Sequence, residues 1–200
     1  MSEDNKDKAG IIEKILSVEL EMFLNVPSAG KSSCQEYPES FKTHRRAHFF
    51  PWSKDTLECY LQDLHTALAS GTNLMTLKYA RMDNLIPPLN TNPLIGKIVE
   101  IQCAWQRDVL LKYPGIMGGG RPLSSADDSS SMTSFETYLR GEIETYSDTT
   151  LKLLYRDMLH KQAQGISMSR EVYEYLVREK GYSSMEDAEK QIQAKTKRGS

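Results

Sequence analysis

The chain of 200 residues is long enough for one ordinary domain, and its hydrophobic (39%) and charged (26%) fractions are those of a water-soluble globular protein. A net charge of −2 argues against a nucleic-acid-binding protein, since such proteins usually carry an excess or a stripe of basic residues. The basic segment 42–48 (KTHRRAH) is a local exception, either a solvated turn or a clamp for a phosphate or carboxylate group. No apolar run approaches the roughly 18 residues of a membrane span, so neither nucleic acid nor a membrane is an expected partner.

The cysteines and the first residues favour a cytoplasmic protein. Cys34, Cys59 and Cys103 are an odd number without metal-binding spacing, which is typical of reduced thiols. The opening MSEDNKDKAG is polar and acidic, unlike a signal peptide. We expect a disordered tail over residues 1–8, a single domain over 9–195 and a frayed tail over 196–200.

Apolar residues recur with helical spacing in nearly every segment, and neither a hairpin signal nor an internal repeat is evident. The first predicted helix covers 9–25, and an irregular segment, 27–52, follows it. Ser53 is a predicted N-cap for a helix that ends near Ser70, with Gly71 just beyond. A shorter helix is predicted over 73–85.

The second half of the chain is predicted to be helical as well. Pro93 marks the first turn of a helix that runs to about Tyr113, and a Gly- and Ser-rich loop covers 114–132. Thr133 and Glu136 form a capping box for a helix that reaches Gln164 or breaks near Ser147. Two further helices begin near Ser169 and Ser183. The sequence therefore predicts an all-α bundle of six to eight helices with two long irregular loops.

Four of these helices carry a long polar side chain in the middle of the apolar stripe, namely Glu19, Arg81, Gln102 and Glu142. Tyr138 and Tyr146 flank Glu142 at four residues to each side, and Lys78 lies beside Arg81. A buried carboxylate without partners costs several kcal/mol or loses its charge, so we expect these side chains to satisfy one another. Two interpretations stay open: a buried ionic network that fixes helix register, or a polar pocket for a ligand with the two loops as its rim.

Cofactor chemistry finds little support in the motifs. The paired Glu-x-x-His motifs of di-iron bundles are absent, and His44 and His48 at i,i+4 lack the Glu of a His-Glu-x-x-His motif, so we expect neither a metal nor another cofactor. Cys34 is a candidate thiolate only if His44 or Arg45 lies near it, and otherwise an idle thiol. The glycines of GGGRP (118–122) either let the backbone approach a ligand and aim Arg121 inward, or form a flexible loop.

Several motifs resemble an uncharacterised helical family of bacteria and fungi, domain of unknown function 4125, over about residues 10–185. They are SCQEYPESF, YARM, LIGKIVEIQCAWQ, YPGIMGGGRPL and TSFETYLRGEIETYS. The resemblance implies an all-helical domain of unassigned activity, some relatives of which adjoin nucleotidyltransferase-like domains. Leu77 stands where the family usually has Glu, which puts the substrate or the activity of this member in doubt. The positions that match are Glu19, Cys34, Gln35, Lys78, Arg121, Ser134, Glu136, Arg140 and Glu142.

We expect an enzyme that performs metal-independent acid–base chemistry on a small amino-acid-like or charged metabolite. The catalytic candidates are Glu142, Glu19, Tyr138 and Tyr146. The candidates for substrate binding are Arg81, Lys78, Gln102, Arg121, Arg140, Cys34, Gln35 and Ser134. The alternative is a non-catalytic helical module that binds a ligand or a partner, for instance beside a nucleotidyltransferase.

Overall fold

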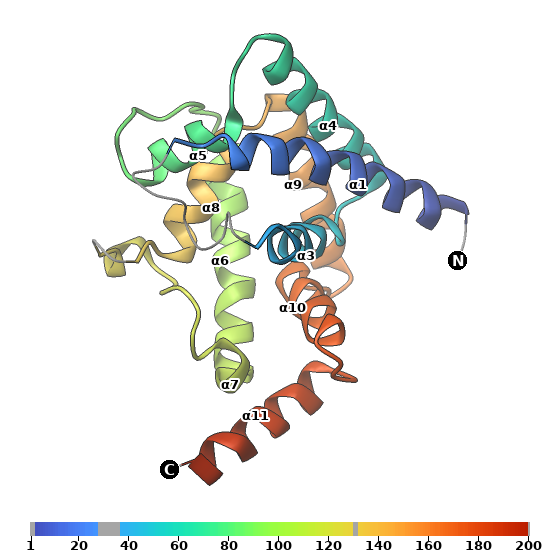
Figure 1. The fold of residues 1–200 in the computed structure, drawn as a ribbon, viewed down its shortest axis with the longest axis vertical. Coiled ribbons are helices and arrows are strands. Elements are labelled where there is room, and N and C mark those ends of the chain that lie inside the picture. Colours follow the sequence, from blue (N-terminus) through green and yellow to red (C-terminus); the bar gives the residue numbers. More distant parts are fainter. Residues whose placement is uncertain (1–2, 28–36, 130–131, 200) are drawn as a thin grey trace.

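The computed structural model describes residues 3–27, 37–129 and 132–199, and within these ranges it contains ten α-helices, one short 3-10 helix and no strand (Figure 1). The all-α prediction is confirmed, but six to eight helices was too few. The helices are α1 (Glu3–Leu24), α3 (Pro38–Phe49), α4 (Lys54–Ala69), α5 (Leu74–Met82), α6 (Leu94–Lys112), α7 (Pro114–Met117), α8 (Phe135–Ile143), α9 (Asp148–Ala163), α10 (Met168–Glu179) and α11 (Met185–Gly199). None of the described helices is long and apolar enough to cross a membrane.

The additional helices lie in the segments that were predicted to be irregular. α3 forms inside 27–52, where the polar sequence PESFKTHRRAHF hides the helical period, and its buried residues include an arginine. α7 is a single turn inside the predicted loop 114–132, too short to show periodicity. α1 and α11 also extend through residues predicted as a disordered and a frayed tail, starting at Glu3 and ending at Gly199.

Polar caps fix the helix boundaries in the second half of the chain. The Ser147 side chain accepts a hydrogen bond from the Thr150 amide, so the second of the two predicted alternatives holds and the helix breaks near Ser147 into α8 and α9. Ser134, rather than the predicted Thr133, caps α8 by accepting from the Thr137 amide at 3.1 Å. Glu136 binds the amide and hydroxyl of Ser125 instead of closing a capping box.

The chain contains an internal repeat that its sequence does not reveal. The first unit consists of α1, α3, α4 and α5, and the second of α6, α8, α9 and α10. From α3 to the start of α5 the two units correspond at a constant offset of 94 residues, which takes the N-cap Ser53 to Ser147 and the left-handed Gly71 (φ +69°) to Gly165 (φ +69°). α4 and α9 both have 16 residues, and α5 and α10 both start three residues after the glycine.

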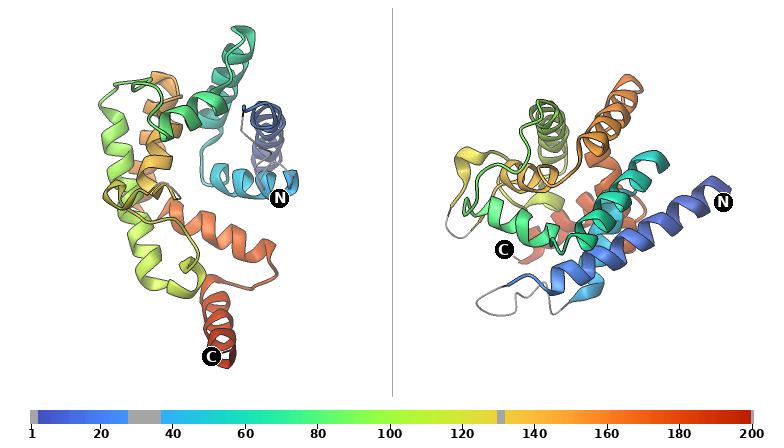
Figure 2. Two further views of the ribbon diagram at one scale, coloured as in Figure 1. Left: turned by 60° about the vertical axis from the view of Figure 1, so that its left-hand side comes forward. Right: turned by 90° about the horizontal axis from the view of Figure 1, so that it is seen from above.

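Packing follows the same repeat. α1 packs on α3, α4 and α5, and α6 packs on α8, α9 and α10 (Figure 2). The units join through α4 against α9, and through two equivalent crossings, α5 on α8 and α10 on α3. His48 lies 3.4 Å from its own counterpart Glu142, and Trp52 meets its counterpart Tyr146 edge to face. Contacts between equivalent residues are expected close to a pseudo-two-fold axis.

Two aspartates exchanged between the units reinforce this arrangement. Asp157 on α9 accepts from the Ser53 amide at 2.9 Å and from the Thr56 hydroxyl at 2.6 Å, at the start of α4. Asp63 on α4 accepts from the Ser147 amide at 3.0 Å and from the Thr150 hydroxyl at 2.6 Å, at the start of α9. A carboxylate at a helix N-terminus satisfies free amides and the helix dipole, so each central helix stabilises the other.

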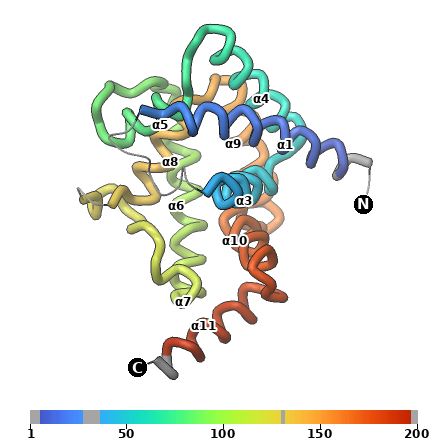
Figure 3. The backbone as a smooth tube through the Cα atoms, in the orientation of Figure 1, coloured from blue at the N-terminus to red at the C-terminus, as the bar shows by residue number. Residues whose placement is uncertain are grey.

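The main core fills the space between the two units, and a smaller core lies beneath α7 and α11. α11 extends away from the two units toward the C-terminus (Figure 3). The carboxylate of Glu189 holds α11 in place by accepting from the Gly115 amide at 2.7 Å and the Ile116 amide at 2.8 Å, at the start of α7.

Candidate functional site

Four charged side chains from four helices meet in the main core. Glu19 of α1, Arg45 of α3, Lys78 of α5 and Glu142 of α8 are each 5% exposed or less. We call these four residues the charge cluster. It contains two carboxylates and two cations, so burial costs are offset only if every charge is paired.

Arg45 joins the two carboxylates. Its Nε and Nη2 atoms donate to both Glu19 oxygens at 2.7 and 2.6 Å, and its Nη1 atom lies 2.8 Å from Glu142 Oε1. Tyr60 completes the surroundings of Glu19 by donating to Oε1 at 2.7 Å. The planar guanidinium suits this geometry, because it can bind one carboxylate through two nitrogens and a second through the third.

Glu142 is surrounded by donors. Lys78 Nζ donates to Oε2 at 2.7 Å, and the Tyr146 hydroxyl donates to Oε1 at 2.8 Å. Burial alone would raise the pKa of Glu142, but Arg45 and Lys78 outweigh burial and hold the pKa well below its usual range. Glu142 is therefore an ionised carboxylate near neutral pH and a weak base.

The two cations of the charge cluster and the neighbouring phenol of Tyr146 keep their protons. Burial would lower the pKa values of Arg45 and Lys78, but the nearby carboxylates outweigh it and raise both. Burial, and then Glu142, raises the pKa of Tyr146, so that its hydroxyl stays a donor. The charge cluster is neutral as a whole and fully hydrogen-bonded.

A cavity of about 90 Å3 lies beside the charge cluster. Glu142 borders it from one side, and the other polar side chains of its wall are His48, Gln102, Gln106, Tyr138, Ser169 and Tyr173. The cavity is formed mainly by α6, α8 and α10, with His48 and Trp52 from the first unit. The structure thus contains a closed ionic network and, next to it, a mainly apolar cavity with several polar side chains in its wall. No described residue of the predicted rim segment 114–132 lines this cavity.

His48 is the least satisfied group of the cavity wall. Its Nε2 atom is buried and lies 3.4 Å from Glu142 Oε1, but the geometry does not make a hydrogen bond. Burial lowers the pKa of His48 to about 3; Glu142 opposes this shift, whereas Arg45 and Lys78 add to it. The imidazole is therefore neutral near pH 7, and the short distance to Glu142 is not an ion pair.

Tyr138 is another wall residue with unused hydrogen-bonding capacity, as is Tyr173, whose oxygen accepts from Gln106 at 2.9 Å and whose phenolic proton has no acceptor among the described residues. The Tyr138 oxygen accepts from Lys78 Nζ at 2.6 Å, and the ammonium also lies 3.9 Å from the ring centroid. Among the described residues no acceptor takes the phenolic proton of Tyr138. The guanidinium of Arg121 lies over the same ring, 5.0 Å from its centroid.

The remaining predicted residues lie outside the charge cluster. Arg81 pairs with Glu144 at 2.7 Å, so the prediction that it joins Glu19 and Glu142 was wrong. Arg121 donates to the Thr133 carbonyl at 2.7 Å, and Arg140 lies 3.8 Å from Glu136 at the surface. Ser134 is a helix cap, Gln102 lines the cavity, and Cys34 and Gln35 lie outside the described residues.

Sequence reasoning missed Arg45, His48 and Tyr60. The segment that contains the first two was interpreted as a solvated turn or an anion clamp, whereas it forms a helix whose Arg45 and Phe49, four residues apart, point inward. The spacing of Arg45, His48 and Phe49 was the available signal, but their surroundings of polar residues concealed it.

Loss of stability on acidification should report on His48. Its folded pKa lies below the unfolded value of about 6.5, so its contribution is complete above that value and is lost as the pH falls toward about 3. Between pH 7 and pH 5 we expect the free energy of unfolding to fall by about 2 kcal/mol through this residue. Unfolding curves of the parent and of His48→Gln at both pH values check this prediction. In His48→Gln this part of the pH dependence should vanish, whereas the exposed-histidine control His65→Gln should keep it. Equal pH dependence in the parent and His48→Gln would contradict the prediction.

Comparison with known proteins adds one finding. The model of one family, described as a protein of unknown function (DUF4125), matches residues 9–190. No curated protein and no solved structure matches the chain. Within the described residues no three or more His, Cys, Asp or Glu side chains are grouped so as to hold a metal ion.

Proposed function

The chain belongs to the DUF4125 family of proteins of unknown function, and we propose that it is an enzyme that binds a small polar metabolite in the 90 Å3 cavity and performs acid–base chemistry there. The observation that carries the proposal is the buried Nε2 atom of His48, which has no hydrogen-bond partner and lies on the same cavity wall as the phenolic proton of Tyr138. Buried polar groups normally find partners, and those left without one are typical of binding and catalytic sites.

The proposed roles follow from the contacts. Tyr138 is the proton donor, since Lys78 occupies its oxygen from one side and leaves the proton for a ligand. Neutral His48 forms a hydrogen bond with the ligand through its Nε2 atom. Glu142 and Arg45 are positioning residues: they hold Lys78 by a chain of ion pairs, which fixes the Tyr138 oxygen.

The size of the cavity limits the ligand. A volume of about 90 Å3 holds several groups of the size of a water molecule. A metabolite larger than this places one end group in the cavity and the rest outside.

Substitution of Tyr138 by phenylalanine tests the proposal. We expect turnover of small carbonyl, hydroxyl or amide metabolites, followed by mass spectrometry of a mixture, to fall by about 100- to 10,000-fold when the proton donor is lost. Tyr79→Phe is the matched control. The Tyr79 ring centroid also lies near Lys78, 5.7 Å from its Nζ atom, but Tyr79 does not line the cavity. Equal turnover by the parent and Tyr138→Phe would overturn the assigned role.

One observation favours a second candidate, a module that binds the ligand without converting it. The low pKa of Glu142 leaves the cluster without a strong base. In that case the parent shows ligand-dependent stabilisation but no turnover of any metabolite in the mixture, and Tyr138→Phe weakens only the stabilisation.

A further inference from the structure

The cavity has an occupied counterpart in the first unit. The offset of 94 residues takes Arg45 to Leu139 and Lys78 to Val172, and both later residues line the cavity. Between α1 and α6 the buried positions correspond at an offset of 83 residues, which takes Glu19 to Gln102. The place filled by a guanidinium and an ammonium in the first unit is bordered by shorter, apolar side chains in the second.

The change of size accounts for the empty volume. Arginine to leucine and lysine to valine remove the long polar ends that, in the first unit, lie between α1, α5 and α8. Leu139 and Val172 leave this space open in the second unit, where the cavity lies between α6, α8 and α10. The cavity therefore lies where the first unit has the ends of two hydrogen-bond donors.

The charges change together with the size. Each charged residue of the cluster has an uncharged counterpart in the other unit. In the second unit these are Gln102 for Glu19, Leu139 for Arg45 and Val172 for Lys78, and in the first unit neutral His48 is the counterpart of Glu142. The anionic acceptors have become neutral acceptors, the Gln102 carbonyl and the His48 imidazole. The charge of Glu142, which also borders the cavity, is already balanced by Arg45 and Lys78.

We infer that the cavity takes a neutral carboxamide or ureido end group. The inference rests on the proposed function and names the ligand class of the same site. The N–H groups of the amide donate to the Gln102 carbonyl and, in the Nδ1–H tautomer of His48, to Nε2. In the charge cluster the nitrogens of Arg45 and Lys78 donate to Glu19 and Glu142 in the same way. The amide carbonyl accepts the unused proton of Tyr138.

Charged end groups are disfavoured by desolvation. An ammonium or amidinium in the cavity loses its hydration and finds no unpaired carboxylate, since both carboxylates of the cluster are bound to Arg45 and Lys78. A carboxylate group would lie next to Glu142 and would find no free cation on the cavity wall. A neutral amide satisfies the unused donor and acceptor without either cost.

Three probes of the same planar shape test the inference: acetamide, acetate and acetamidinium, with charges of about 0, −1 and +1 at neutral pH. Each is titrated into the full-length protein while the ring signals of His48 and the methyl signals of Val172 are followed by NMR. We expect saturable shifts with acetamide alone. Four non-hydrogen atoms limit the affinity to a Kd of about 40 μM or weaker, so millimolar concentrations are needed.

Two variants locate the binding. Val172→Met extends a longer, unbranched side chain into the cavity, as the Lys78 stem does in the first unit, and is expected to abolish the acetamide response. Gln102→Leu removes one acceptor at nearly constant volume and is expected to weaken acetamide binding at least tenfold. A response that survives in Val172→Met would place acetamide elsewhere and overturn the inference, provided that the NMR spectrum shows the variant folded.

The outcomes separate the inference from the proposed function. Saturable binding of acetamidinium or acetate, but not of acetamide, overturns the neutral-amide inference and leaves a ligand cavity in place. Binding of none of the three overturns both. Binding of acetamide with unaltered turnover in Tyr138→Phe supports the inference and contradicts the proposed role of Tyr138.

Discussion

Replacement of Arg45 by leucine, its counterpart in the second unit, is expected to lower the free energy of unfolding by about 3–5 kcal/mol. The substitution leaves Glu19 fully buried and Glu142 with Lys78 as its remaining cation. For a chain of this length, thermal unfolding should occur roughly 6–20 °C below the parent, as measured by calorimetry. The effect is large because uncompensated charges remain in the core, not because an ion pair is intrinsically strong.

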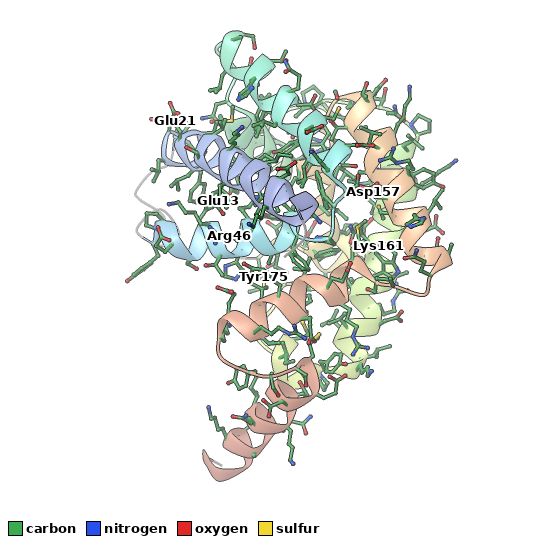
Figure 4. The ribbon with its side chains drawn as sticks, turned by 90° about the vertical axis from the view of Figure 1, so that its right-hand side faces the viewer. Glu13, Glu21, Arg46, Asp157, Lys161 and Tyr175 are labelled. Carbon is green, nitrogen blue, oxygen red and sulfur yellow. The ribbon has the colours of Figure 1, made fainter. Side chains whose placement is uncertain are left out.

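Arg46→Leu is the matched control. Arg46 lies next to Arg45 on α3 and binds Glu13 through two nitrogens at 2.8 and 3.1 Å, but at the surface (Figure 4). The Glu13 side chain is 56% exposed, so we expect a loss below about 1 kcal/mol. Equal losses of unfolding free energy in Arg45→Leu and Arg46→Leu would show that burial does not decide how much each arginine contributes to stability.

A double variant sharpens the test. Arg45→Leu combined with Glu19→Gln recreates the uncharged Gln102 and Leu139 of the second unit within the first. The double variant should be more stable than Arg45→Leu alone, since it no longer buries the Glu19 charge. Additive losses would contradict the coupling of the two residues.

Glu142→Leu is the second substitution with a large expected effect, also about 3–5 kcal/mol. It removes the carboxylate that pairs with Arg45 and Lys78 and accepts a hydrogen bond from Tyr146. The cluster is left with two cations and with Glu19 as its one carboxylate. Lys78 then loses its hydrogen-bonded anion in a site where it is 3% exposed. The melting temperature of the variant without added ligand checks this expectation.

Arg140→Leu is the control for this substitution, because it lies on the same helix and its ion pair with Glu136 is long, at 3.8 Å, and half-exposed. We expect a change below about 1 kcal/mol. An unchanged or raised melting temperature for Glu142→Leu would mean that the cluster costs the fold stability, as in sites where stability has been given up for activity.

The apolar periodicity of most segments was sufficient to predict the helices that carry the main core. The stripe of α1, for example, contains Ile12, Ile15 and Leu16, which are buried as the helical spacing requires. The same projection placed Glu19, Gln102 and Glu142 on inward faces, because an inward position depends mainly on local helical geometry. Helix α3 was missed since Arg45 takes a position that a purely apolar pattern would fill with leucine.

The sequence by itself determined most of the helices and the inward positions of Glu19, Gln102 and Glu142, because both depend on the spacing of residues along one helix. Only the tertiary structure decided that Arg45 joins Glu19 to Glu142, that Arg81 pairs with Glu144, and that the cavity lies beside the cluster. These contacts join residues far apart in the chain, and a single sequence carries no direct signal for them. The repeat was equally hidden, because its units share the order of helices, several caps and the buried positions but few residue types, and packing constrains the former more strongly than the latter.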